Sequence, residues 1–289
     1  MLKFRFFRFV PAFLLATLSC TNVYFENPVP QKAEALSAVP EALPGLYEFV
    51  NQEEKNEDNA FEQFKNCILI ENTGESQLLV SSETRLHERD LPALKARLEA
   101  KKAAGEISDY TLTNRFLLCT AMIPAENDAR KPQQQYVSLT KEGSWYVVAQ
   151  TRRPFMLLDF KTGTSSALTA VKSGNMSGLL PEADSLETEP ARLVARSKDG
   201  GYYFNREKTE VAGWELMCLL PRAGGWLLKT SDVAKDKEFK DRLGDFSKIT
   251  PFEKIDESKY RIHPNDGELA RLLAEKDLFY AAELRRLEP

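Results

Sequence analysis

The sequence has few of the residues on which most enzyme and metal sites depend. It holds two histidines in 289 residues, His87 and His263, and they lie far apart. Its four cysteines show none of the close pairing that zinc sites use. A Ser-His-Asp triad would need one of the two histidines, and neither has a recognisable nucleophile nearby in sequence. The pattern therefore predicts no metal and no cofactor.

Motifs for nucleotide binding and acyl transfer are missing as well. There is no phosphate-binding loop, Gly-x-Gly-x-x-Gly fingerprint or His-Glu-x-x-His pair, and Gly-Asn-Met-Ser-Gly at 174–178 lacks the spacing of a nucleophile elbow. Carboxylate pairs remain open, because a sequence does not show which of 43 acidic residues meet. Asp159 lies in an apolar run, which favours a buried, hydrogen-bonded carboxylate at a strand end over a catalytic one.

An excess of positive charge is also lacking. The formal net charge is −4, and loss of the first 19 residues, with their three cations, leaves −7. No basic stripe is present, which excludes nucleic acid as a partner. The contents of hydrophobic residues (43%) and charged residues (28%) are those of a soluble globular protein. No segment after residue 20 is long and apolar enough for a transmembrane helix.

The N-terminus carries the clearest signal in the chain. Lys3, Arg5 and Arg8 precede an uncharged run at 9–19 that ends in small residues. Such a pattern is typical of a secretory signal peptide, here residues 1–19, and the run is too short to span a bilayer. Cys20 follows directly.

Residues 17–20, Thr-Leu-Ser-Cys, resemble the lipobox of bacterial lipoproteins. The resemblance implies that Cys20 becomes the first residue, carries diacylglycerol and palmitate-type chains, and anchors the protein in the outer membrane. Each buried CH₂ of such chains contributes about 0.8 kcal/mol, so several chains hold durably. The alternative is ordinary cleavage after Ser19, because Thr17 and Ser19 also suit a standard site, giving a soluble periplasmic or secreted protein.

Four prolines between residues 20 and 44 predict an extended, weakly ordered tether: Pro28, Pro30, Pro40 and Pro44. Pro-x-Pro at 28–30, followed by Leu-x-Gly-x-Tyr at 43–47, resembles the opening of envelope lipoproteins common in Bacteroidota. The second motif is also similar to the Gly-x-Trp start of lipocalin-like barrels. These resemblances imply a β domain over 45–289, a membrane contact through the lipid anchor and an envelope protein as partner.

The body of the chain predicts a mainly β fold of antiparallel sheets, sandwich or barrel-like, with two short helices near 91–104 and 266–275. Hairpins are expected to join 67–70 to 78–80 and 214–220 to 226–230. A weak repeat, 141–147 and 198–204, leaves open one domain or two related lobes divided near 173–190. At 281–287, propensity favours helix, whereas the resemblance favours strand.

Two further expectations concern packing. Residues 116–123 are apolar on both faces, which predicts a central strand covered on each side. Cys67, Cys119 and Cys218 each lie in an apolar run, so buried free thiols are expected first, and one disulfide is the alternative.

Six aromatic residues form a candidate ligand-cavity lining: Trp145, Tyr146, Tyr202, Tyr203, Trp214 and Trp226. Such residues more often fill the interior between sheets. The leading hypothesis is a non-catalytic envelope lipoprotein that binds a partner or serves a structural role. The alternatives are a lipocalin-like carrier of a small apolar ligand and an envelope hydrolase with paired carboxylates.

Overall fold

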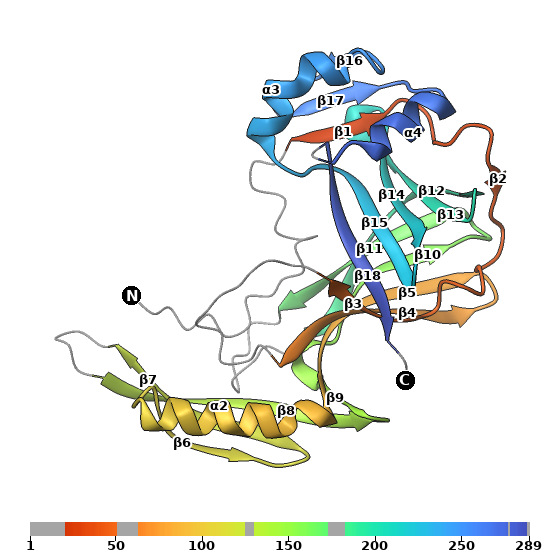
Figure 1. Cartoon of the computed structure of the whole chain (residues 1–289). Helices are drawn as coiled ribbons and strands as arrows, with labels where there is room; N and C mark the ends of the chain where they lie inside the picture. The colour runs from red at the N-terminus through yellow and green to blue at the C-terminus, as the bar shows by residue number, and fades with distance from the viewer. Residues whose placement is uncertain (1–20, 51–62, 125–129, 173–182, 277, 288–289) are drawn as a thin grey trace.

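A ring of antiparallel strands forms the centre of the molecule (Figure 1). The computed structural model describes residues 21–50, 63–124, 130–172, 183–276 and 278–287. The mainly β class is confirmed, with three α-helices among these residues. Each strand of the ring pairs with the next, and the tenth pairs with the first: β3 (Gly45–Val50), β4 (Phe64–Gly74), β5 (Gln77–His87), β10 (Arg153–Asp159), β11 (Thr164–Lys172), β12 (Ala183–Lys198), β13 (Gly201–Lys208), β14 (Gly213–Arg222), β15 (Gly225–Val233) and β18 (Phe279–Leu287).

The last strand closes this ring, which is unevenly formed. In β18, Leu284 pairs with Trp226 of β15 on one side and Phe49 of β3 on the other, and the β15 pairing is interrupted by a register shift. The sequence left residues 281–287 open between helix and strand, and the structure shows a strand. Pairing on both sides satisfies the backbone groups and removes an exposed sheet edge.

Apolar side chains from nine of the ten ring strands, all but β11, gather in its interior. Tyr47, Ile70, Val80 and Phe204 are among the buried members of this cluster. Both predicted hairpins, β4–β5 and β14–β15, are present in its wall. The sequence left open two lobes divided near 173–190. Strands β11 and β12, which flank residues 173–182, pair along one continuous sheet, and residues 173–182 themselves lie outside the described part of the chain.

A second core covers the outer face of the ring wall at β13, β14 and β15. Its cover consists of β1 (Asn22–Phe25), β16 (Phe252–Lys254), β17 (Lys259–Ile262), α3 (Asp236–Phe246) and α4 (Asp266–Ala274). The sequence predicted α4, and its Asn265 forms the expected N-terminal cap with Glu268. Lys229 of β15 donates from Nζ to the carbonyls of Leu273 and Glu275 at the other end of α4 (2.5 and 3.1 Å).

The first part of the segment expected to be a weakly ordered tether, residues 21–30, is packed against the body, whereas residues 31–42 are exposed or only partly buried. Strand β1 lies parallel to β17, and β2 (Glu34–Ala35) pairs with β12. Val23, Phe25 and Val29 are buried in the second core. Val29 lies in the chain between β1 and β2 and is held by Asn205 of β13. The buried Asn205 side chain accepts from the Val29 N–H and donates to the Val29 carbonyl (2.9 Å each). Proline does favour extended backbone here, but apolar burial keeps that backbone in place.

The third part, which we call the α2 module, comprises residues 88–148. At its C-terminal end, β5 pairs through residues 85–87 with β9 (Trp145–Val148) in place of β10, and β9 pairs with β8 (Arg130–Glu142). Strands β7 (Phe116–Pro124) and β6 (Ile107–Leu112) continue this sheet, and α2 (Leu91–Ala103) packs on one face (Figure 1). Helix α2 was predicted. A short 3₁₀ turn, Glu88–Asp90, leads into it, and Asp90 at its N-terminus forms no side-chain cap hydrogen bond.

The expectation that residues 116–123 are covered on each side is wrong. Strand β7 lies between β6 and β8, yet its burial alternates: Leu117 and Cys119 are buried under α2, whereas Leu118 and Met122 are partly exposed. Apolar residues on a second face do not prove that a second layer exists.

Candidate functional site

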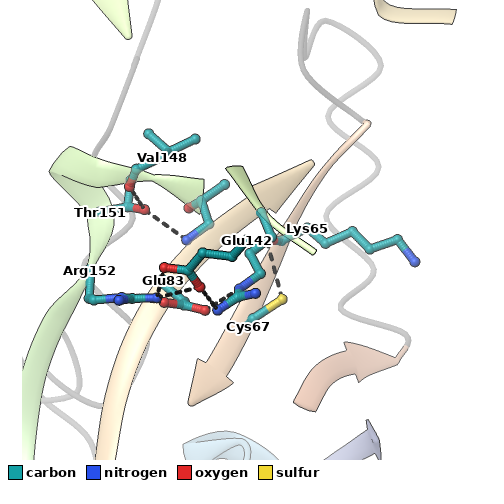
Figure 2. A network of polar contacts seen from close by, with 9 residues as sticks. Lys65, Cys67, Glu83, Glu142, Val148, Thr151 and Arg152 are labelled. Carbon is teal, nitrogen blue, oxygen red and sulfur yellow. Dashed lines mark hydrogen bonds and ion pairs between the residues drawn. The ribbon is translucent and has the colours of Figure 1, made fainter. Parts of the chain in front are cut away.

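The most concentrated group of charged side chains lies where the α2 module meets the ring (Figure 2). We call it the β5 charge cluster. Glu83 and Arg85 come from β5, the strand shared by both parts, and Glu142 ends β8. Arg152 follows the 3₁₀ turn Ala149–Thr151 that leads back into the ring. The turn is itself fixed, because Thr151 Oγ1 accepts from the Thr84 N–H (2.7 Å) and donates to the Val148 carbonyl (2.7 Å).

In this cluster each carboxylate accepts from both guanidinium groups. Glu83 accepts from Arg85 Nε and, at 2.7 Å, from Arg152 Nε. Glu142 accepts from Arg85 Nη2 at 2.9 Å and from Arg152 Nη2 at 3.1 Å. The Glu83 side chain is 0% exposed and that of Arg85 is 7% exposed. The side chains of Glu142 and Arg152 are each 38% exposed, so two negative and two positive groups balance in a site that is buried at β5 and open to solvent at Glu142 and Arg152.

The same row of contacts continues across the outer face of the ring. Arg285 pairs in register with Glu48, Glu48 with Cys67, and Cys67 with Glu83. Glu48 accepts from Lys65 Nζ at 2.5 Å and from Arg285 Nε at 2.6 Å. Burial raises the pKa of the Glu48 carboxyl, but its hydrogen bonds to these cations lower it by more, so the net shift is downward.

This arrangement favours a rigid joint over acid–base chemistry. A general acid must release a proton near neutral pH, and a guanidinium group does not. Burial alone would lower the pKa of Arg152, but its bonds to Glu83 and Glu142 raise the pKa by more, so the net shift is upward. The cluster therefore consists of fixed charges that connect two parts of the fold.

The cysteine beside the cluster has no nucleophilic character at neutral pH. Burial raises the pKa of the Cys67 thiol to about 12, and the nearby Glu83 carboxylate adds to the shift. Burial likewise raises the pKa of Cys119 to about 11 and that of Cys218 to about 12. All three are free and buried, as first expected. Only the thiolate attacks, so these residues are not candidate nucleophiles.

We expect these three thiols to resist alkylation in the folded protein. Native protein treated with N-ethylmaleimide at pH 7.5 is expected to show no modification of Cys67, Cys119 or Cys218, because each thiol is buried and protonated. Peptide mass spectrometry measures this, and the same protein unfolded in guanidinium chloride is the control that labels fully. Rapid labelling of Cys67 before unfolding would contradict the assignment.

The six aromatic residues of the candidate cavity divide among three cores. Tyr202 and Trp226 meet inside the ring, with centroids 5.4 Å apart. Trp226 Nε1 also donates to the Tyr47 hydroxyl (3.3 Å). Tyr203 and Trp214 belong to the second core. Of the remaining two, both on β9, Tyr146 belongs to the core under α2, whereas Trp145 packs against His87. The structure therefore does not bring the six residues together as one lining.

The other residues singled out from sequence make local contacts. Asp159 is partly exposed at the end of β10 and accepts from Gln77 Nε2 (2.9 Å) and from the N–H groups of Lys161 and Thr162. The Gln77 contact leads the interactions that lower its pKa. His87 packs edge-on against Trp145, and His263 bonds Glu26 at 2.6 Å. Asp159 is thus hydrogen-bonded at a strand end as expected, but less buried.

Sequence reasoning missed the β5 charge cluster. Glu83 and Arg85 alternate with smaller residues in β5, a pattern that normally indicates a face turned to water. The available signal was the pair of arginines at 152 and 153 directly before a strand. Among the described residues, no group of three or more His, Cys, Asp or Glu side chains is placed to hold a metal ion.

Comparison with family models, curated proteins and solved structures finds no match to this chain. In the part of the chain that the structure describes, no helix has the length and apolar character needed to cross a bilayer.

Proposed function

We propose that this chain is a bacterial envelope lipoprotein, held in the outer membrane through Cys20, that binds an envelope partner or serves a structural role there without catalysis. The observation that carries the proposal is the order of the first twenty residues. Three cations, an uncharged run at 9–19 and a cysteine at its end form the pattern of a processed and acylated leader.

The fold is compatible with removal of such a leader. Thr21 and Asn22 are fixed by Asp236, Val233 and Ser258, all of them in the body of the protein. None of these hydrogen bonds needs a residue before position 21. Cleavage before Cys20 therefore leaves the contacts of β1 in place.

The chemistry of the body supports a role in binding or structure. Its densest group of charges pairs carboxylates with guanidiniums, and its three described cysteines are buried thiols with raised pKa values. Neither the paired charges nor the buried thiols are placed to activate a substrate.

Acylation and location can be tested together. The full chain is expressed in a bacterium with a lipoprotein pathway that is fed alkyne-palmitate, and the cells are then fractionated. We expect the wild-type protein to carry the label and sediment with outer membranes, and Cys20→Ala to be unlabelled and soluble. Cys218→Ala is the matched control and should keep the label, because Cys218 is buried in the second core. An unlabelled, soluble wild-type protein would refute the proposal.

A further inference from the structure

The residue that follows Cys20 is already part of the folded body. The Thr21 N–H donates to Asp236 Oδ1 at 2.8 Å, at the start of α3. The Thr21 carbonyl accepts from the Val233 N–H at 3.0 Å, at the end of β15. One residue on, the Asn22 N–H donates to the Ser258 carbonyl at 2.8 Å. Thr21 is 0% exposed, so no flexible residue separates position 20 from the fold.

This changes the reach of an anchor at Cys20. A free tether over residues 20–44 would extend up to about 80 Å, at roughly 3.3 Å per residue. With Thr21 fixed in the body, the Cα atom of Cys20, which carries the anchor, is only about 3.8 Å from the Cα atom of Thr21. The headgroup layer on each side of a bilayer is about 5–8 Å thick, so a body attached at this distance touches that layer.

The surface around Thr21 is formed by two short segments, which we call the anchor corner. One is the start of α3, with Lys235 and Asp236, and the other is the turn at 255–258 between β16 and β17. Strand β17 begins with Lys259, in register with Asn22. The Lys235 side chain is 63% exposed and that of Lys259 is 36% exposed, so both amines can reach a surface that lies against this corner.

We propose that the acylated Cys20 holds the anchor corner directly against phospholipid headgroups and so gives the body one fixed orientation on the bilayer. This inference rests on the acylation proposed above. The opposite side of the ring then faces away from the membrane. Lys161, exposed directly after β10, is the comparison residue, because β11, β12 and β13 separate β10 from β14 in the order of strand pairing.

The test compares the reactivity of these lysines on vesicles. Acylated full-length protein is reconstituted in vesicles of phosphatidylethanolamine and phosphatidylglycerol and treated briefly with an amine-reactive ester. Peptide mass spectrometry then measures the modification of Lys235, Lys259 and Lys161. The matched variant carries a Gly/Ser spacer of about 20 residues between Cys20 and Thr21, with an r.m.s. span of roughly 25 Å.

In the wild-type protein we expect Lys235 and Lys259 to react several-fold more slowly than in the spacer variant, and Lys161 to react equally in both. Mass spectrometry of the N-terminal peptide reports acylation separately. If the peptide is acylated and all three lysines react alike in both proteins, the orientation is wrong while the anchor stands. If the peptide is not acylated, the anchor and the orientation both fail.

Discussion

Replacing Asn205 by alanine is expected to lower the free energy of unfolding by about 2–6 kcal/mol, because two buried backbone groups lose their partners at about 1–3 kcal/mol each. Asn205 is 0% exposed, and its side-chain amide bonds both the N–H and the carbonyl of Val29. It also donates to the Val194 carbonyl at 3.1 Å. Because Asn205 is 0% exposed, we expect bulk solvent not to compensate this loss.

Guanidinium-induced unfolding, followed by tryptophan fluorescence, measures this change. Asn72→Ala is the matched control, because Asn72 also accepts from a backbone N–H, that of Gly74, but at an exposed turn. We expect that control to unfold close to the wild-type midpoint. Hydrogen exchange should locate the Asn205→Ala effect in residues 21–36, which would exchange faster than the ring. Equal midpoints for the two variants would show that the Val29 contact does not hold this segment.

The packing of residues 21–44 could not be predicted from local sequence. A proline-bearing segment is extended whether it is docked or free, so composition does not distinguish the two states. What decides between them is the burial of Val23 and Val29 in the second core together with the bonds from Asn205, 176 residues away from Val29 in the chain. By contrast, α2, α4 and the hairpins β4–β5 and β14–β15 depend on periodicity, caps and turns within short windows, and these were predicted.

Tertiary packing also explains why α3 was not predicted and why the state of β18 was left open. Helix α3 has Phe239, Leu243 and Phe246 at helical spacing, but it lies in a highly charged stretch. It gains its stability by packing against Phe252 and Tyr260 of β16 and β17, the strands that follow it in the chain. Strand β18 has helix-favouring residues, and its state is decided by pairing with β15 and β3. Of the candidate site, sequence reasoning placed the cysteines correctly in the interior. It missed the β5 charge cluster, because no local pattern shows that β8 and the 149–151 turn cover β5.

The second large loss of stability is expected when one charge is removed from the β5 charge cluster. Glu83→Gln is expected to cost about 3–5 kcal/mol of unfolding free energy, the range seen when one member of a buried ion pair is removed. The amide keeps the shape of the side chain but leaves Arg85, 7% exposed, with only Glu142 to balance it. The control is Asp245→Asn in α3, whose pair with Lys248 is exposed on both sides. Solvent screens such a pair, so we expect no measurable change.

A double variant separates the value of the charges from the cost of leaving one unpaired. In Glu83→Leu/Arg85→Met, both buried charges are replaced by apolar groups, and Arg152 keeps its contact with Glu142. Because desolvation offsets much of the attraction in a buried pair, we expect this variant to be more stable than Glu83→Gln and close to the wild type. Denaturant unfolding of the wild type, Glu83→Leu, Arg85→Met and the double variant gives the coupling energy. If the double variant is instead the least stable, the charges themselves hold the α2 module to the ring, and desolvation is a minor cost at this joint.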